Sequence, residues 1–65
     1  MPIYTFYLRK PDGSAPHFEA HELSGDQAAE ARARELLERH HSASHVEAFD
    51  HDRRVLTRSR ESVAG

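Results

Sequence analysis

Residues 24–40 read SGDQAAEARARELLERH, and this stretch decides the fold because it predicts a helix between two pairs of strands. Ser24 is a favourable N-cap residue, and Gln27 follows three positions later, which is the spacing of a capping box. Every residue from Asp26 to about His40 forms or tolerates a helix. Side chains at helical spacing define one face of it, namely Ala29, Ala33, Leu36, Leu37 and His40. We therefore expect a helix over 26–40 that packs this face on a core.

Two strands are predicted before the helix. Residues 3–9, IYTFYLR, are dense in β-branched and aromatic types, which is typical of a strand. The proline, aspartate and glycine of residues 10–14, KPDGS, then predict a turn. A second strand over about 17–23 places Phe18 and Ala20 on one face. The other face carries His17, Glu19 and His21.

Two further strands are predicted after the helix, over about 45–50 and 54–59, with a polar turn between them. Two hairpins around one helix predict an α+β fold of the ββαββ type. Its four-stranded, mostly antiparallel sheet would carry the helix on one face. The expected core consists of Tyr4, Phe6, Leu8, Phe18, Ala20, Leu23, Ala29, Ala33, Leu36, Leu37, Val46, Ala48 and one of Val55 or Leu56.

Length and composition limit the classes of protein to consider. Sixty-five residues allow a single domain, 1–65, and we expect the tail from about 60 to 65 to be frayed. No apolar run reaches the roughly 18–20 residues of a membrane span, and no signal peptide is expected. The absence of cysteine excludes disulfides and fits a reducing compartment, so we expect a cytoplasmic protein.

The sheet face away from the helix is the most informative surface. If the helix covers Tyr4, Phe6 and Leu8, then Ile3, Tyr7 and Phe49 point the other way. We expect Val55 or Leu56 to lie beside them. A face with several large apolar groups is often covered by a partner, although single exposed apolar residues are also normal. Because so small a core often needs a partner, we expect a non-enzymatic protein-association domain that forms a homodimer through this face.

An alternative reading concerns the polar face of the second strand. His17, Glu19 and His21 stand at alternate positions, about 6.6 Å apart in steps of two residues, on one side of the strand. Neutral imidazoles and a carboxylate are suitable ligands for zinc or a similar ion. A fourth ligand could come from His45 or from a second copy. These residues could instead form a pH-responsive module, and a solvated strand face is the plain alternative to both.

A third reading is single-stranded nucleic-acid binding. Tyr7 and Phe49 could stack bases while four arginines hold phosphates, namely Arg9, Arg53, Arg54 and Arg58. The net charge of −2 argues against this reading. No nucleophile elbow and no phosphate-binding glycine loop is present in the sequence, so we expect neither an enzyme nor a cofactor.

The order of short sequence pieces also resembles a known type of protein. The pieces are Tyr4-x-Phe6-x-Leu8, Asp12-Gly13, Glu22-Leu23, Ala28-Ala29, Ala33-Arg34-Glu35-Leu36-Leu37 and Val46-Glu47-Ala48-Phe49. Together they cover roughly residues 4–56 and resemble small bacterial domains of unknown function. The resemblance implies the ββαββ fold and assigns no activity and no site residue. The pair His17 and His21 is not a feature of that pattern.

Overall fold

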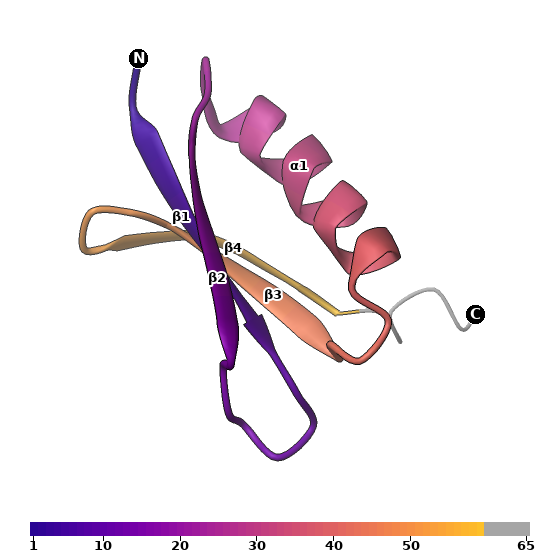
Figure 1. Cartoon of the computed structure of the whole chain (residues 1–65). Coiled ribbons are helices and arrows are strands. Elements are labelled where there is room, and N and C mark those ends of the chain that lie inside the picture. The colour runs from indigo at the N-terminus through magenta and orange to yellow at the C-terminus, as the bar shows by residue number, and fades with distance from the viewer. Residues whose placement is uncertain (60–65) are drawn as a thin grey trace.

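A computed structural model describes residues 1–59 of the chain and shows five elements in the expected order (Figure 1). They are β1 (Ile3–Arg9), β2 (His17–Glu22), α1 (Asp26–Arg39), β3 (His45–Asp50) and β4 (Arg53–Ser59). The predicted α+β fold of the ββαββ type is confirmed. The expected frayed tail over 60–65 lies outside the described residues.

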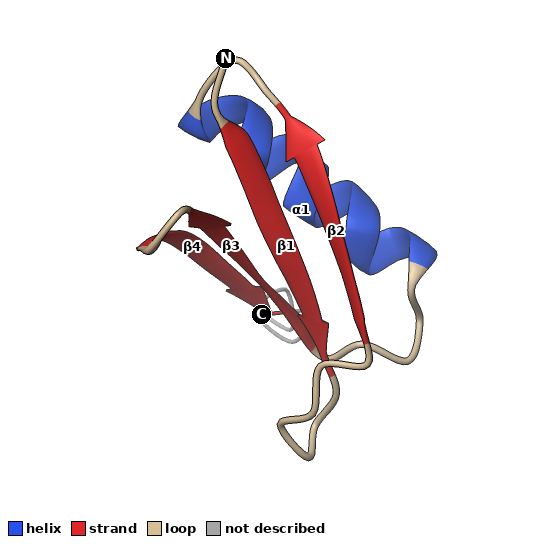
Figure 2. Cartoon of the chain, turned by 60° about the vertical axis from the view of Figure 1, so that its left-hand side comes forward, coloured by secondary structure: helices blue, strands red, loops and turns tan. Residues whose placement is uncertain are grey.

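The four strands form one sheet in the order β2-β1-β3-β4, and every neighbouring pair is antiparallel. Because β2 and β3 both run antiparallel to β1, they are parallel to each other and need a long crossover, which α1 provides. The helix lies on one face of the sheet, and no element covers the other face within residues 1–59 (Figure 2). We call this uncovered side the open face.

The core lies between α1 and the sheet. Tyr4, Phe6 and Leu8 of β1 alternate toward the helix and are at most 2% exposed. The other buried residues of 1–59 are Ala29, Ala33, Leu36, Leu37, Ala43, Val46 and Ala48. Ala43 is an addition to the expected core. It lies in the turn after the helix, where its backbone N–H donates to the carbonyl oxygen of His40 at 3.0 Å.

Strand β2 faces the opposite way from our expectation. The register pairs Tyr7 with Phe18 and Thr5 with Ala20, so Phe18 and Ala20 lie on the open face and not in the core. Phe18 is 64% exposed. The pairing with β1 decides this, because directly opposed residues of neighbouring strands point to the same side of a sheet.

The start of the helix also differs from the prediction. Gly25, rather than Ser24, occupies the N-cap position, and no side chain caps the helix there. The carbonyl oxygen of Gly25 accepts the first helical hydrogen bond, from the N–H of Ala29 at 3.0 Å. Asp26 therefore becomes the first helical residue, where its negative charge is favourable to the helix dipole.

Candidate functional site

Three aromatic side chains from three strands meet on the open face. The Tyr7 ring lies 6.0 Å from the Phe18 ring and 5.7 Å from the Phe49 ring, the latter edge to face. These separations lie in the favourable range for aromatic pairs. We call Tyr7, Phe18 and Phe49 the aromatic cluster. It forms because Phe18 is directly opposite Tyr7 in β2, while Phe49 is diagonal to it in β3.

The predicted positions of Ile3, Tyr7 and Phe49 on the open face are confirmed by the strand register. Ile3 is 55% exposed at the end of β1. Sequence reasoning missed Phe18 as the third ring, because it assigned this residue to the core. Phe18 is thus a large apolar side chain of the open face that the sequence did not place there.

Val55 and Leu56 do not belong to the open face. Both pack against the core cluster, and a β-bulge explains how two consecutive residues do so. Ala48 pairs with Leu56 whereas Phe49 pairs with Arg54, which leaves Val55 as the extra residue. The prediction that one of them lies beside Tyr7 is therefore wrong in its placement.

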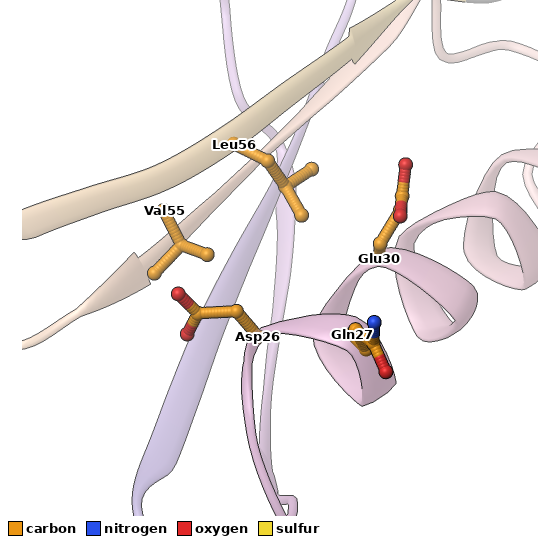
Figure 3. Close-up of a pocket in the computed structure, with 5 residues that line it drawn as sticks. All are labelled: Asp26, Gln27, Glu30, Val55 and Leu56. Carbon is orange, nitrogen blue, oxygen red and sulfur yellow. The ribbon is translucent and has the colours of Figure 1, made fainter.

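An open groove separates this part of β4 from the first turn of α1 (Figure 3). It has a volume of about 280 Å³ and is lined by Asp26, Gln27, Glu30, Val55 and Leu56. Two apolar side chains face three polar ones across it (Figure 3).

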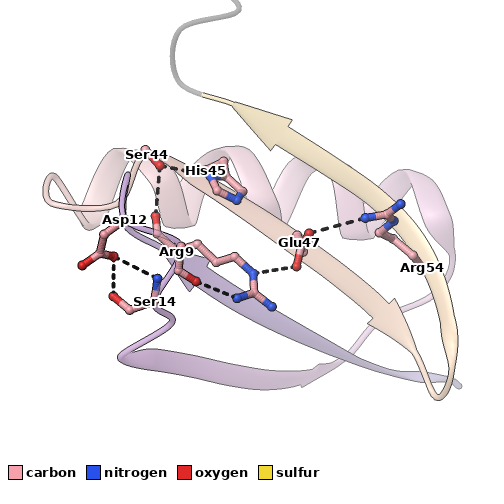
Figure 4. A network of polar contacts seen from close by, with 8 residues as sticks. Arg9, Asp12, Ser14, Ser44, His45, Glu47 and Arg54 are labelled. Atoms are coloured by element: carbon pink, nitrogen blue, oxygen red, sulfur yellow. Dashed lines mark hydrogen bonds and ion pairs between the residues drawn. The ribbon is translucent and has the colours of Figure 1, made fainter.

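A chain of ion pairs joins Arg9, Glu47 and Arg54 (Figure 4), and Glu47 is directly opposite Tyr7 of the aromatic cluster. The Arg9 Nε donates to Glu47 Oε1 at 2.7 Å, and the Arg54 Nη1 donates to Glu47 Oε2 at 3.5 Å. The hydrogen bond from Arg9 lowers the pKa of the Glu47 carboxyl, so this group is ionised at neutral pH. The Arg9 guanidinium carbon also lies 6.0 Å from the centre of the Tyr7 ring, within cation–π range.

The arginines proposed to hold phosphates all contact carboxylates. Arg53 Nη2 lies 3.4 Å from Asp26 Oδ1 and 3.2 Å from Asp50 Oδ2, on the helix side of the sheet. Arg9 and Arg54 pair with Glu47 as described, and Arg58 Nη1 lies 3.5 Å from Glu30 Oε2. An arginine already paired with a carboxylate offers less attraction to a phosphate, so this arrangement does not favour the nucleic-acid reading.

The same Asp26 carboxylate accepts a hydrogen bond from the Tyr4 hydroxyl at 2.8 Å. This contact gives the buried Tyr4 ring a partner for its polar end. The hydrogen bonds from Tyr4 and then Arg53 lower the pKa of Asp26.

A second group of polar side chains lies on the helix side of β2. Because Phe18 and Ala20 face outward, His17, Glu19 and His21 face the helix. The end of α1 brings His40 next to them. We call His17, Glu19, His21 and His40 the His–Glu cluster. The structure therefore brings the three predicted strand residues together, and it supplies His40, not His45, as the neighbouring histidine.

Glu19 is the centre of the His–Glu cluster. Its Oε2 lies 2.9 Å from His17 Nε2 and 3.6 Å from His40 Nε2, and its Oε1 lies 2.8 Å from His21 Nε2. The hydrogen bonds from His17 and His21 lower the pKa of Glu19 to about 2. A fully ionised carboxylate therefore stands among three imidazoles.

Sequence reasoning did not connect His40 with β2, because twenty-odd residues and a complete helix separate them. The sequence indicated only a histidine at the helix C-terminus, where a positive charge is favourable to the dipole. The contact between the His17 and His40 rings, with centroids 4.7 Å apart, depends on where the crossover helix ends relative to β2.

Comparison of the chain with protein-family models, with curated proteins and with solved structures finds no match in any of the three. The resemblance to small bacterial domains of unknown function therefore stays a prediction. Within residues 1–59, no helix has the length and apolar character needed to cross a bilayer.

Proposed function

We propose that this chain is a non-catalytic association domain whose open face binds a second copy of the same chain. The observation that carries the proposal is the aromatic cluster on a sheet face that no element covers within residues 1–59. Phe18 and Ile3 remain 64% and 55% exposed there. Exposed apolar side chains in one contiguous area are a common sign of an interaction surface.

The size of the core supports the need for a partner. Ten residues of the described chain are buried, and four of them are alanines. Domains below roughly 70–80 residues rarely obtain more than 3–5 kcal/mol from one core. Complete burial of a Leu- or Phe-sized side chain stabilises by about 1.5–3 kcal/mol. Because Phe18 is 64% exposed, covering this ring alone would stabilise the chain by about 1–2 kcal/mol, a substantial fraction of the stability of so small a domain.

The charges of the open face favour a second copy as the occupant. The charged strand residues on the open face are two basic and two acidic ones, Arg9, Arg54, Glu22 and Glu47. Two such faces can meet without net repulsion, and Arg9 and Arg54 each already have a carboxylate partner. A strongly acidic or basic partner would gain little from a face that is neutral in sum.

Sedimentation equilibrium or light scattering tests this proposal. A concentration series from about 1 µM to about 1 mM covers dissociation free energies of about 8 to 4 kcal/mol. We expect the mass to rise toward twice that of a single chain. Phe18→Ser should raise the dissociation constant, so that the dimer forms only at higher protein concentrations. The effect is doubled because the substitution occurs twice in a two-fold interface. Tyr7→Asp and Phe49→Asp should abolish it.

Ala31→Ser is the matched control, because Ala31 is exposed on the helix, away from the open face. It should leave the dissociation constant unchanged. A wild-type chain that stays monomeric up to about 1 mM contradicts the proposal. So does a dimer that survives Phe18→Ser, Tyr7→Asp and Phe49→Asp, because another surface must then hold it together.

A further inference from the structure

We propose that the His–Glu cluster is a binding site for a divalent transition-metal ion, with Zn²⁺ as the reference ion. The ligands are the imidazole nitrogens of His17 and His40 and Oε2 of Glu19. One donor atom of each residue lies within 4.8 Å of the other two. Two imidazoles and one carboxylate form a ligand set that suits zinc and its neighbours, with water completing the coordination.

The distances are close to those that a bound ion requires. Tetrahedral zinc with bonds of about 2.0–2.1 Å places its ligand atoms about 3.3 Å apart. Glu19 Oε2 lies 2.9 Å from His17 Nε2 and 3.6 Å from His40 Nε2, on either side of that value. The two imidazole rings already lie next to each other, with centroids 4.7 Å apart and an angle of 32° between their planes. Small side-chain rotations are therefore enough to close the site.

His21 is the positioning residue of this site. Its Nε2 donates to Glu19 Oε1 at 2.8 Å, so the other carboxylate oxygen is left to face His17 and His40. The His21 ring packs edge to face on the buried Phe6, with centroids 5.8 Å apart, which holds the imidazole in place. A ligating carboxylate with a hydrogen-bond donor on its second oxygen is the usual arrangement around protein-bound metals.

The ligands come from β2 and from the end of α1, two elements that make few other contacts with each other. None of the six residues of β2 is buried, so this edge strand is held mainly by its backbone pairing with β1. His40 follows directly after the last residue of α1. An ion that joins His17 and Glu19 to His40 would fasten the edge strand to the helix. The cluster is also reachable from water, since the His17 and His40 side chains are 48% and 32% exposed.

Calorimetric titration of the metal-free, tag-free chain with ZnCl₂ tests the site. We expect one ion per chain. The melting temperature should rise by about 10–20 °C when free zinc is about 100 times its dissociation constant. Titration with Co²⁺ gives an independent readout, because visible absorption bands of tetrahedral intensity should develop to the same end point.

His40→Ala and His41→Ala form a matched pair, because the two histidines are neighbours and only His40 belongs to the His–Glu cluster. We expect His40→Ala to weaken zinc binding at least tenfold and to remove the cobalt bands, while His41→Ala leaves both unchanged. Glu19→Gln should weaken binding similarly, and His21→Ala should weaken it less, because His21 acts through Glu19. Circular dichroism of each metal-free variant establishes that it is folded.

Four results would overturn the proposal: no zinc binding by the wild-type chain, equal losses in His40→Ala and His41→Ala, unchanged binding in Glu19→Gln, or one ion per two chains. If His40→Ala fails to fold, His17→Ala replaces it in the comparison. The site lies on the helix side of β2, so these outcomes are independent of whether the open face forms a dimer.

Discussion

Replacing Phe18 or Phe6 by alanine should have very different effects on stability, although both are phenylalanines in neighbouring strands. Phe6 is 0% exposed, and truncating a fully buried phenylalanine costs about 3–5 kcal/mol. Phe18 is 64% exposed, so only about a third of a full burial energy of 1.5–3 kcal/mol is at stake. We expect Phe18→Ala to lower the free energy of unfolding of the monomer by about 0.5–1 kcal/mol.

Urea denaturation at a protein concentration below the onset of association measures both values. The loss predicted for Phe6→Ala approaches the total stability of a domain of this size, so this variant should be largely unfolded. The milder pair Phe6→Leu and Phe18→Leu then provides the ranking, and Phe6→Leu should show the larger loss. A loss above about 2 kcal/mol for Phe18→Ala in the dilute monomer would refute this reasoning, since it would place the ring beneath the helix. Any additional loss of stability for Phe18→Ala at high protein concentration measures the contribution of this ring to the dimer.

Three further predictions concern single residues. Tyr4→Phe removes the hydroxyl that donates to Asp26 at 2.8 Å and should lower the free energy of unfolding by about 1 kcal/mol. Urea denaturation at neutral pH measures this loss, and an unchanged midpoint would show that the bond contributes no net stability. In the metal-free chain, Glu19→Gln should be less stable than wild type above pH 4.5, and this difference should disappear as the pH falls toward about 2. The reason is that folding lowers the pKa of Glu19 from 4.5 to about 2. Thermal melts that keep a constant difference between the two chains over this pH range would contradict the prediction. Gly13→Ala should cost about 1–2 kcal/mol, because Gly13 has a φ of 90°, and the control Gly25→Ala, at an extended φ of 173°, should cost clearly less by the same melts.

The sequence predicts some parts of the fold well because the physical signal there is strong. In β1, Tyr4, Phe6 and Leu8 share one face, whereas the other face includes Thr5 and Arg9. A slip of one residue would expose all three of these large side chains. The helix is similarly determined, because its alanines and leucines return at helical spacing between polar residues. These two patterns are sufficient to predict most of the core, while the ββαββ order also depends on the turns and on the other three strands.

The signal in β2 and β4 is weaker, and there the prediction failed. One face of β2 carries Phe18 and Ala20, and the other carries two imidazoles and a carboxylate. Hydrophobicity therefore favours burial of the face that the structure exposes. In β4, a bulge breaks the alternation and turns both Val55 and Leu56 toward the core. A bulge depends on how a strand pairs with its neighbour, so the residues of β4 alone do not predict it.

By itself, the sequence determined which segments are helical or extended and which face of β1 and α1 is buried, because these follow from the spacing of apolar side chains along a single segment. It also determined that Tyr7 and Phe49 face away from the helix. Only the tertiary structure decided that Phe18 joins them and that His40 meets His17 and Glu19. The register of β2 on β1 and the end point of the crossover helix decide these contacts. Both are properties of two paired elements, which a local pattern of residues does not encode.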